Sequence, residues 1–120
     1  MPNIRKAASS APTKKESFKA KNNREKLLVE SILSLKTEDQ VLSLLRDMLT
    51  IPEIEEFSNR ITIAKRLLEG LPYLEIAKEI GTSTTTVTRV AHWLYNGCGG
   101  YYGALKKYDT TLKRAKKSTP

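Results

Sequence analysis

The sequence predicts an all-α fold, and three observations support this prediction. Apolar residues recur three and four positions apart over residues 23–96, which is the spacing of one helix face. Serine, threonine, asparagine, proline and glycine stand at the ends of these periodic segments, where they start and stop helices. No alternation of apolar and polar residues is long enough for a strand. We therefore expect one helical domain at residues 23–108, between disordered basic tails at residues 1–22 and 109–120.

The first three expected helices start at residues whose side chains can cap the first turn. Asn23, Thr37 and Thr50 are these candidate N-caps, and Glu53 completes a capping box with Thr50. The third helix ends at Gly70. The second helix is apolar over more than half of its circumference, through Val41, Leu42, Leu44, Leu45, Met48 and Leu49. Both sides of that helix therefore need apolar partners.

Two short helices follow, at about residues 73–80 and 83–96, and a glycine turn joins them. Ala77 is small enough for a close helix crossing, and Gly81 tolerates the positive φ of the turn. The apolar core of the pair comes from Ile76, Ile80, Val87 and Val90. These positions have the spacing of a helix-turn-helix. An αα-hairpin that only packs into the core is the alternative interpretation.

The second helix of this pair is rich in threonine, whose branched Cβ makes it a mediocre helix former. The inward face is predicted by Val87, Val90, Ala91 and Leu94, at positions i, i+3, i+4 and i+7. The threonines lie mostly on the opposite face and near the N-terminal end, the part of a recognition helix that reaches base edges. Hydroxyl groups there donate and accept hydrogen bonds, and the methyl group can contact a thymine methyl. The candidate DNA-binding residues are Lys78, Thr82, Ser83, Thr84, Thr85, Thr88, Arg89 and His92.

The formal net charge of +8 is unevenly distributed along the chain. Residues 1–22 and 97–120 each have a net charge of +5, whereas residues 23–96 have a net charge of −2. Basic tails bind polyanions such as the nucleic-acid backbone, although they also serve solubility alone.

The targeting and redox signals of the sequence indicate a cytoplasmic protein. No apolar run approaches the ~20 residues that span a bilayer. The basic N-terminal segment has no apolar stretch typical of a secretory signal. The single cysteine forms no intrachain disulfide, which fits a reducing compartment.

The sequence offers no candidate catalytic or metal site. His92 and Cys98 are its single histidine and cysteine, and two such ligands do not close a zinc site. A Cys–His nucleophile pair would lack an orienting third group and an oxyanion hole. No phosphate-binding loop or dinucleotide motif is present. We therefore expect a binding protein without metal or cofactor, rather than an enzyme.

Two stretches, "LTIPEIEEFSNRITIAKRLLEG" and "IAKEIGTSTTTVTRV", contain four features in a fixed order. These are a Thr-Pro-acidic helix start, a helix with an internal arginine, a closing Leu-Leu-x-Gly and a Thr-x-Thr-Arg recognition helix. In this respect residues 49–96 resemble the tryptophan repressor family. The later "YNGCGGYYGAL" is more similar to uncharacterised relatives of that repressor. The resemblance implies a homodimer with interlocked N-terminal helices and two recognition helices in successive major grooves, about 34–36 Å apart.

The resemblance also implies a pocket for a small effector. In that family two arginines enclose an indole ring and one of them binds its carboxylate, and the matching positions are Arg60 and Arg89. The repressor has glycine at the position of Val90 and serine at the position of Trp93, so this chain has more bulk there. We expect the indole of Trp93 to occupy the pocket, and we expect no requirement for free L-tryptophan. The implied pocket residues are Thr50, Arg60, Thr86, Arg89, Val90 and Trp93.

Together these features predict a sequence-specific transcriptional regulator, a repressor by resemblance, whose partners are double-stranded DNA and a second copy of the chain. The residues expected to read bases are Thr84, Thr85, Thr88 and His92, and those expected to contact phosphates are Lys78, Thr82, Ser83 and Arg89. The tails would add salt-dependent affinity. A protein-interaction module that uses the helix pair and an RNA-binding protein that uses tails and tyrosines are the alternatives.

Overall fold

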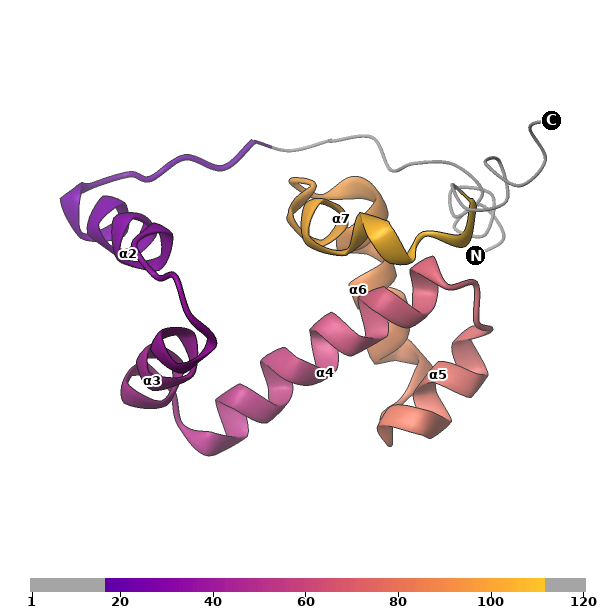
Figure 1. Cartoon of the computed structure of the whole chain (residues 1–120). Coiled ribbons are helices and arrows are strands. Elements are labelled where there is room, and N and C mark those ends of the chain that lie inside the picture. Colours follow the sequence, from indigo (N-terminus) through magenta and orange to yellow (C-terminus); the bar gives the residue numbers. More distant parts are fainter. Residues whose placement is uncertain (1–16, 112–120) are drawn as a thin grey trace, which may run out of the picture. The chain divides into compact units, whose positions relative to one another are not determined.

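The computed structural model of the protein describes residues 17–111, and every regular element in that range is a helix (Figure 1). The helices are α2 (Asn23–Leu33), α3 (Glu38–Met48), α4 (Ile51–Leu68), α5 (Tyr73–Ile80), α6 (Thr84–Asn96) and α7 (Gly100–Leu105), followed by the 3₁₀ helix η1 (Lys106–Tyr108). The predicted all-α fold class is thus confirmed over these residues. Most of both predicted tails, at residues 1–16 and 112–120, lies outside them.

The described chain divides into two compact units. Residues 18–58 form the N-terminal unit, with α2, α3 and the beginning of α4. Residues 59–111 form the C-terminal unit, with the rest of α4, α5, α6, α7 and η1.

Side-chain caps start the helices of the N-terminal unit. The Asn22 side chain accepts a hydrogen bond from the Glu25 amide at 2.9 Å, so the cap of α2 is Asn22 and not Asn23 as predicted. At α3 the Thr37 hydroxyl accepts from the Gln40 amide at 3.2 Å, in a complete capping box. The other predicted caps are confirmed.

The capping box at the start of α4 joins Thr50 and Glu53 in both directions. The Glu53 amide donates to the Thr50 hydroxyl at 3.2 Å, and the Thr50 amide donates to the Glu53 carboxylate at 2.9 Å. Hydrogen bonds from the Thr50 backbone and hydroxyl lower the pKa of Glu53. A carboxylate in the first turn also faces the positive end of the helix dipole, so charge and hydrogen bonding fix the same start.

The N-terminal unit buries none of its side chains. Apart from Phe18, its exposed large apolar residues lie on α2, on α3 and in the first turns of α4: Leu27, Leu28, Val29, Ile32, Leu33, Val41, Leu42, Leu45, Met48, Ile51 and Phe57. Helices of 11 residues such as α2 and α3 are marginal in water unless an apolar face is packed. The sequence predicted that α3 needs partners on both sides, and within this unit neither side is buried.

The hydrophobic core lies in the C-terminal unit. Its largest fully buried side chains are those of Ile63, Ile76, Val87 and Leu94, from α4, α5 and α6. Other core residues are Ala64, Leu67, Leu68, Ala77, Val90, Ala91, Tyr95 and Leu105. Helix α4 and the predicted helix pair, α5 and α6, therefore contribute to one core.

The chain after η1 belongs to this unit and is not the start of a tail. Asp109 is only 3% exposed, and its carboxylate accepts hydrogen bonds from the Tyr102 hydroxyl at 3.0 Å and the Thr111 amide at 2.9 Å. The Thr110 hydroxyl donates to the Leu68 carbonyl at 3.2 Å, which fastens the segment to the end of α4. The prediction placed residue 109 in the tail, and the burial of Asp109 depends on partners that are distant in sequence.

Candidate nucleic-acid interface

The turn between α5 and α6 rests on a glycine in the left-handed region. Gly81 has φ 82° and ψ 39°, and the amides of Gly81 and Thr82 both donate to the Ala77 carbonyl at 2.9 Å. Ser83 then caps α6, because its hydroxyl accepts from the Thr86 amide at 3.2 Å. The two short helices are thus joined by Gly81, Thr82 and Ser83, so α6 begins one residue later than the predicted Ser83.

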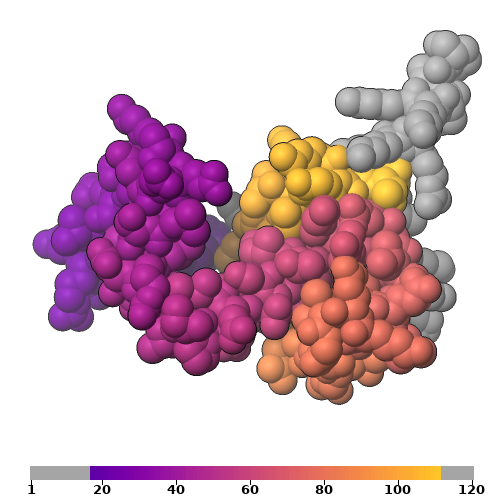
Figure 2. Space-filling model, turned by 60° about the horizontal axis from the view of Figure 1, so that its bottom comes forward, coloured from indigo at the N-terminus to yellow at the C-terminus, as the bar shows by residue number. Residues whose placement is uncertain are grey.

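Helix α6 has one buried and one exposed face. Val87, Val90, Ala91 and Leu94 are buried in the core, which confirms the predicted inward face. Thr84, Thr85, Arg89 and His92 are exposed on the other side, and Lys78 is exposed on α5. Figure 2 shows this surface of the C-terminal unit, where the orange residues of α5 and of the beginning of α6 lie side by side.

Some hydroxyl groups of the threonine-rich segment, residues 82–88, are half-buried or already hydrogen-bonded within the helix. The Thr88 hydroxyl donates to the Thr84 carbonyl at 3.0 Å, and Thr88 is half-buried. The Ser83 hydroxyl is engaged in the cap, and Thr82 is half-buried. Within the described residues, the hydroxyls of Thr84 and Thr85 have no hydrogen-bond partner, so they are the two most available for an external acceptor or donor.

An ion-pair cluster ties α5 to the end of α4. The Arg66 guanidinium donates to both carboxylate oxygens of Glu79, with Nη2–Oε2 at 2.7 Å and Nε–Oε1 at 3.0 Å, and to Glu69 at 2.8 Å. These hydrogen bonds, first to Glu79 and then to Glu69, raise the pKa of Arg66. Bidentate pairing fixes orientation as well as distance, so the cluster sets the position of α5 against α4. Sequence spacing gave no signal for this contact, because its partners lie on different helices.

The residues implied as an effector pocket differ in their surroundings. Val90 is 5% exposed and belongs to the core, and Thr86 is held beside Ser83, with their hydroxyl oxygens 3.3 Å apart. Arg89 is exposed with the outer face of α6. Thr50 belongs to the N-terminal unit, where its hydroxyl caps α4.

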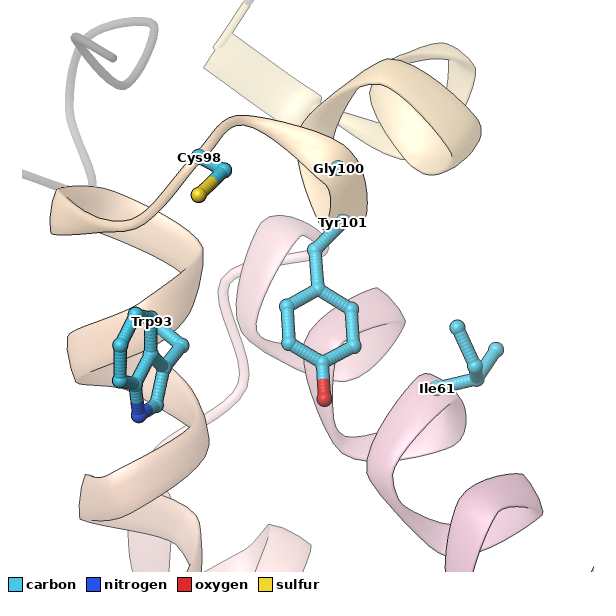
Figure 3. Close-up of a pocket in the computed structure, with 5 residues that line it drawn as sticks. All are labelled: Ile61, Trp93, Cys98, Gly100 and Tyr101. Carbon is cyan, nitrogen blue, oxygen red and sulfur yellow. The ribbon is translucent and has the colours of Figure 1, made fainter. Parts of the chain in front are cut away.

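Arg60 and Trp93, the other two implied pocket residues, lie near Tyr101 of α7. Burial raises the pKa of the Tyr101 phenol, and the positive charge of Arg60 acts in the opposite direction. Trp93 and Tyr101 both line an open pocket of about 370 Å³, together with Ile61, Cys98 and Gly100 (Figure 3). No motif indicated this pocket, since its walls come from α4, the end of α6 and the start of α7.

Across residues 17–111 no group of three or more histidine, cysteine, aspartate or glutamate side chains is arranged to hold a metal ion. The same range contains no helix that is both long and apolar enough to cross a membrane.

Fold and site together define a small all-α protein in which a short helix pair presents hydroxyl and basic side chains. The family model for the Trp repressor protein matches residues 24–109. The chain therefore belongs to the Trp repressor family, as the resemblance implied. Members of this family are regulators rather than enzymes, and they generally bind DNA as dimers.

Named relatives agree with this assignment. The uncharacterised protein YerC of Bacillus subtilis is 38% identical over 84 residues, which is 70% of this chain and 81% of YerC. A solved structure of a TrpR-like protein from Eubacterium eligens is 38% identical, with a TM-score of 0.69, and the match covers 72% of this chain and 90% of that one. A Trp repressor candidate from Staphylococcus aureus is 30% identical, with a TM-score of 0.68, and covers 72% and 87% of the two chains.

Proposed function

We propose that this protein is a sequence-specific DNA-binding transcriptional regulator that acts as a homodimer in the cytoplasm. The proposal rests on one observation above all: α6 is anchored by a buried apolar face and exposes Thr84, Thr85, Arg89 and His92 on the other. Spacings of four and seven residues place Thr85, Arg89 and His92 on one stripe of the helix. In this proposal α5 and α6 form a helix-turn-helix, and α6 is the recognition helix.

The roles of the exposed residues follow from their chemistry. Thr84 and Thr85 stand at the N-terminal end of α6 with hydroxyls available for base edges, and His92 lies further along the helix. Lys78 and Arg89 are the nearby cations, and they suit phosphate oxygens. The hydroxyls of Ser83 and Thr88 are engaged within the helix, and Thr82 is half-buried. The proposal therefore favours the other five of the eight candidates, Lys78, Thr84, Thr85, Arg89 and His92.

The second copy of the chain is proposed from the apolar surface of the N-terminal unit. More than ten large apolar side chains on α2, α3 and early α4 are exposed, far beyond the scattered surface residues of a monomer. Pairing of two such units would bury them, and members of the family are generally dimeric. A two-fold dimer would place its recognition helices in successive major grooves, about 34–36 Å apart.

The effector proposal is that DNA binding does not need free L-tryptophan. The Val90 side chain fills core volume, and the Trp93 indole takes the position that the repressor leaves to a small serine. Isothermal titration calorimetry with L-tryptophan tests this proposal, and we expect no saturable heat. A micromolar dissociation constant would reject it.

A selection of duplexes from a random library, at physiological salt and with the full chain, tests the proposed function. A dimeric sequence reader should enrich a palindromic consensus whose half-sites lie about one helical turn apart. A reporter gene placed behind that consensus then decides between repression, which we propose, and activation. Retention of duplexes without any enriched consensus would contradict sequence-specific binding.

A further inference from the structure

Two lysines lie over one tyrosine ring where η1 meets the end of α4. The Lys65 ammonium is 4.6 Å from the centre of the Tyr108 ring, and the Lys107 ammonium is 5.2 Å from it. The negative face of the ring attracts each cation. The two ammonium groups repel each other, so an anion that they share would stabilise this arrangement.

Contacts on the core side fix η1 against α4. Just after η1 the Thr110 hydroxyl donates to the Leu68 carbonyl at 3.2 Å, and the neighbouring Asp109 is buried. The lysines therefore need little reorganisation of the backbone to meet a partner. In Figure 1 and in Figure 2 the yellow residues of η1 lie beside the end of α4 and away from the turn between α5 and α6. This surface is thus separate from the candidate recognition surface.

The positive charge here is only partly neutralised. Lys65 is 3.9 Å from a Glu69 carboxylate oxygen, but that carboxylate has the closer contact with Arg66, at 2.8 Å. Among the described residues neither Lys106 nor Lys107 forms an ion pair, and both are exposed. We call the following four residues the lysine surface: Lys65, Lys106, Lys107 and Tyr108.

The sequence around the lysine surface adds cations and no exposed carboxylate. Asp109 is the only acidic residue after residue 79, and it is buried, with its carboxylate bonded to the Tyr102 hydroxyl. Residues 112–120 contain four further lysine or arginine residues and no acidic residue. A partner at this surface therefore meets positive charge that continues along the chain.

A regular phosphate backbone matches this charge better than a stacked base does. Ammonium groups are compact point charges that suit phosphate oxygens and read no sequence. A base would have to displace Lys65 and Lys107 from the Tyr108 ring before it could stack there. Duplex DNA carries one negative charge per about 1.7 Å of its axis, so one duplex can meet the surface and the cations that follow it.

We propose that the lysine surface binds the phosphate backbone of duplex DNA outside the segment that α6 reads. The choice of a duplex rests on the proposed function, which brings DNA to the same unit, whereas the binding of phosphates does not. Contacts of this kind would give sequence-independent affinity and would lengthen the stretch of DNA that the protein covers.

Salt dependence of binding to a random-sequence duplex tests the surface without any consensus. A fluorescent duplex would be titrated with the full chain at several salt concentrations, and binding followed by anisotropy. Each lysine that contacts a phosphate contributes about 0.9 to the slope of log affinity against log salt. The double variant Lys106→Gln, Lys107→Gln should therefore make the slope shallower by about 1.8 for each copy that contacts the duplex. An unchanged slope would overturn the proposal.

Matched variants separate this surface from net charge and from folding. Lys106→Arg with Lys107→Arg keeps both charges and should keep the wild-type slope. Lys26→Gln with Lys36→Gln removes two exposed lysines of the N-terminal unit and should change the slope far less. An equal change in that control would mean that only net charge matters, which would overturn the proposal. All four side chains are exposed, so thermal unfolding followed by circular dichroism should not change.

The length and type of nucleic acid show where the surface binds. On a selected consensus, wild type and the Lys106→Gln, Lys107→Gln variant should differ little when the duplex ends at the half-sites, and fully when flanks are added. Equal differences on both duplexes, or a loss seen only with single-stranded RNA, would overturn the proposal. Failure to find any consensus would count against the proposed function alone, because the random-sequence titration does not use one.

Discussion

Substitution of Leu42 by alanine should weaken dimerisation while leaving α3 helical. Leu42 is 56% exposed on α3 in the single chain. Complete burial of a leucine side chain is worth about 1.5–3 kcal/mol, so the exposed share corresponds to about 1–1.5 kcal/mol per copy. The two-fold dimer contains the residue twice, which gives about 2–3 kcal/mol. Since a loss of about 1.4 kcal/mol in binding free energy raises a dissociation constant tenfold, the dimer dissociation constant should rise by about 30- to 100-fold.

Sedimentation equilibrium over a range of concentrations measures this constant directly. Alanine is a better helix former than leucine, so a loss of association cannot be attributed to helix propensity. Leu74→Ala is the matched control, because Leu74 is similarly exposed, at 60%, but lies on α5 in the C-terminal unit. An unchanged dissociation constant for Leu42→Ala, or an equal rise for Leu74→Ala, would refute the assignment of the dimer surface to the N-terminal unit.

Three further predictions concern the C-terminal unit. Gly81→Ala should lower the free energy of unfolding in urea by roughly 1–2 kcal/mol, because a residue with a Cβ is strained at φ 82° even where the surrounding space is open. Gly81→Asn should lower it less, because asparagine tolerates this backbone conformation better. Tyr102→Phe should lower the free energy of unfolding by about 1.5–3 kcal/mol, because it removes a hydrogen bond to a buried carboxylate. The double variant Tyr102→Phe, Asp109→Asn should lose less stability than the two single variants together. Burial raises the pKa of Tyr95, Tyr101 and Tyr102, so the protonated phenols stabilise the fold below the unfolded pKa of about 10. That stability should be lost as pH rises through the folded values, which an alkaline unfolding series followed by circular dichroism detects.

Local signals explain why most of the fold was predictable from the sequence. The capping box of Thr50 and Glu53, the glycine turn at Gly81 and the inward stripe of α6 depend on residues a few positions apart. The cap of α2 was placed one residue too late because Asn22 and Asn23 are chemically identical neighbours.

Contacts between distant segments explain what the sequence did not reveal. Asp109 lies within a basic stretch that reads as a tail, and only its position beside Tyr102 makes it a core residue. The pocket around Trp93 combines three helices without any motif. The hydrogen bond from Thr88 to the carbonyl four residues earlier is different, because serine and threonine often form this local bond inside helices, whereas the sequence pattern was interpreted as placing Thr88 among the base-reading residues.

The central claim, that α6 reads bases, is tested most directly by comparing consensus sequences. Duplex selection should be repeated with Thr85→Ala and Lys78→Ala in the full chain. The account predicts that Thr85→Ala relaxes preference at one position of each half-site, whereas Lys78→Ala lowers affinity for all sequences alike and makes the salt dependence shallower. A Thr85→Ala protein that selects the wild-type consensus with uniformly lower affinity would contradict the claim.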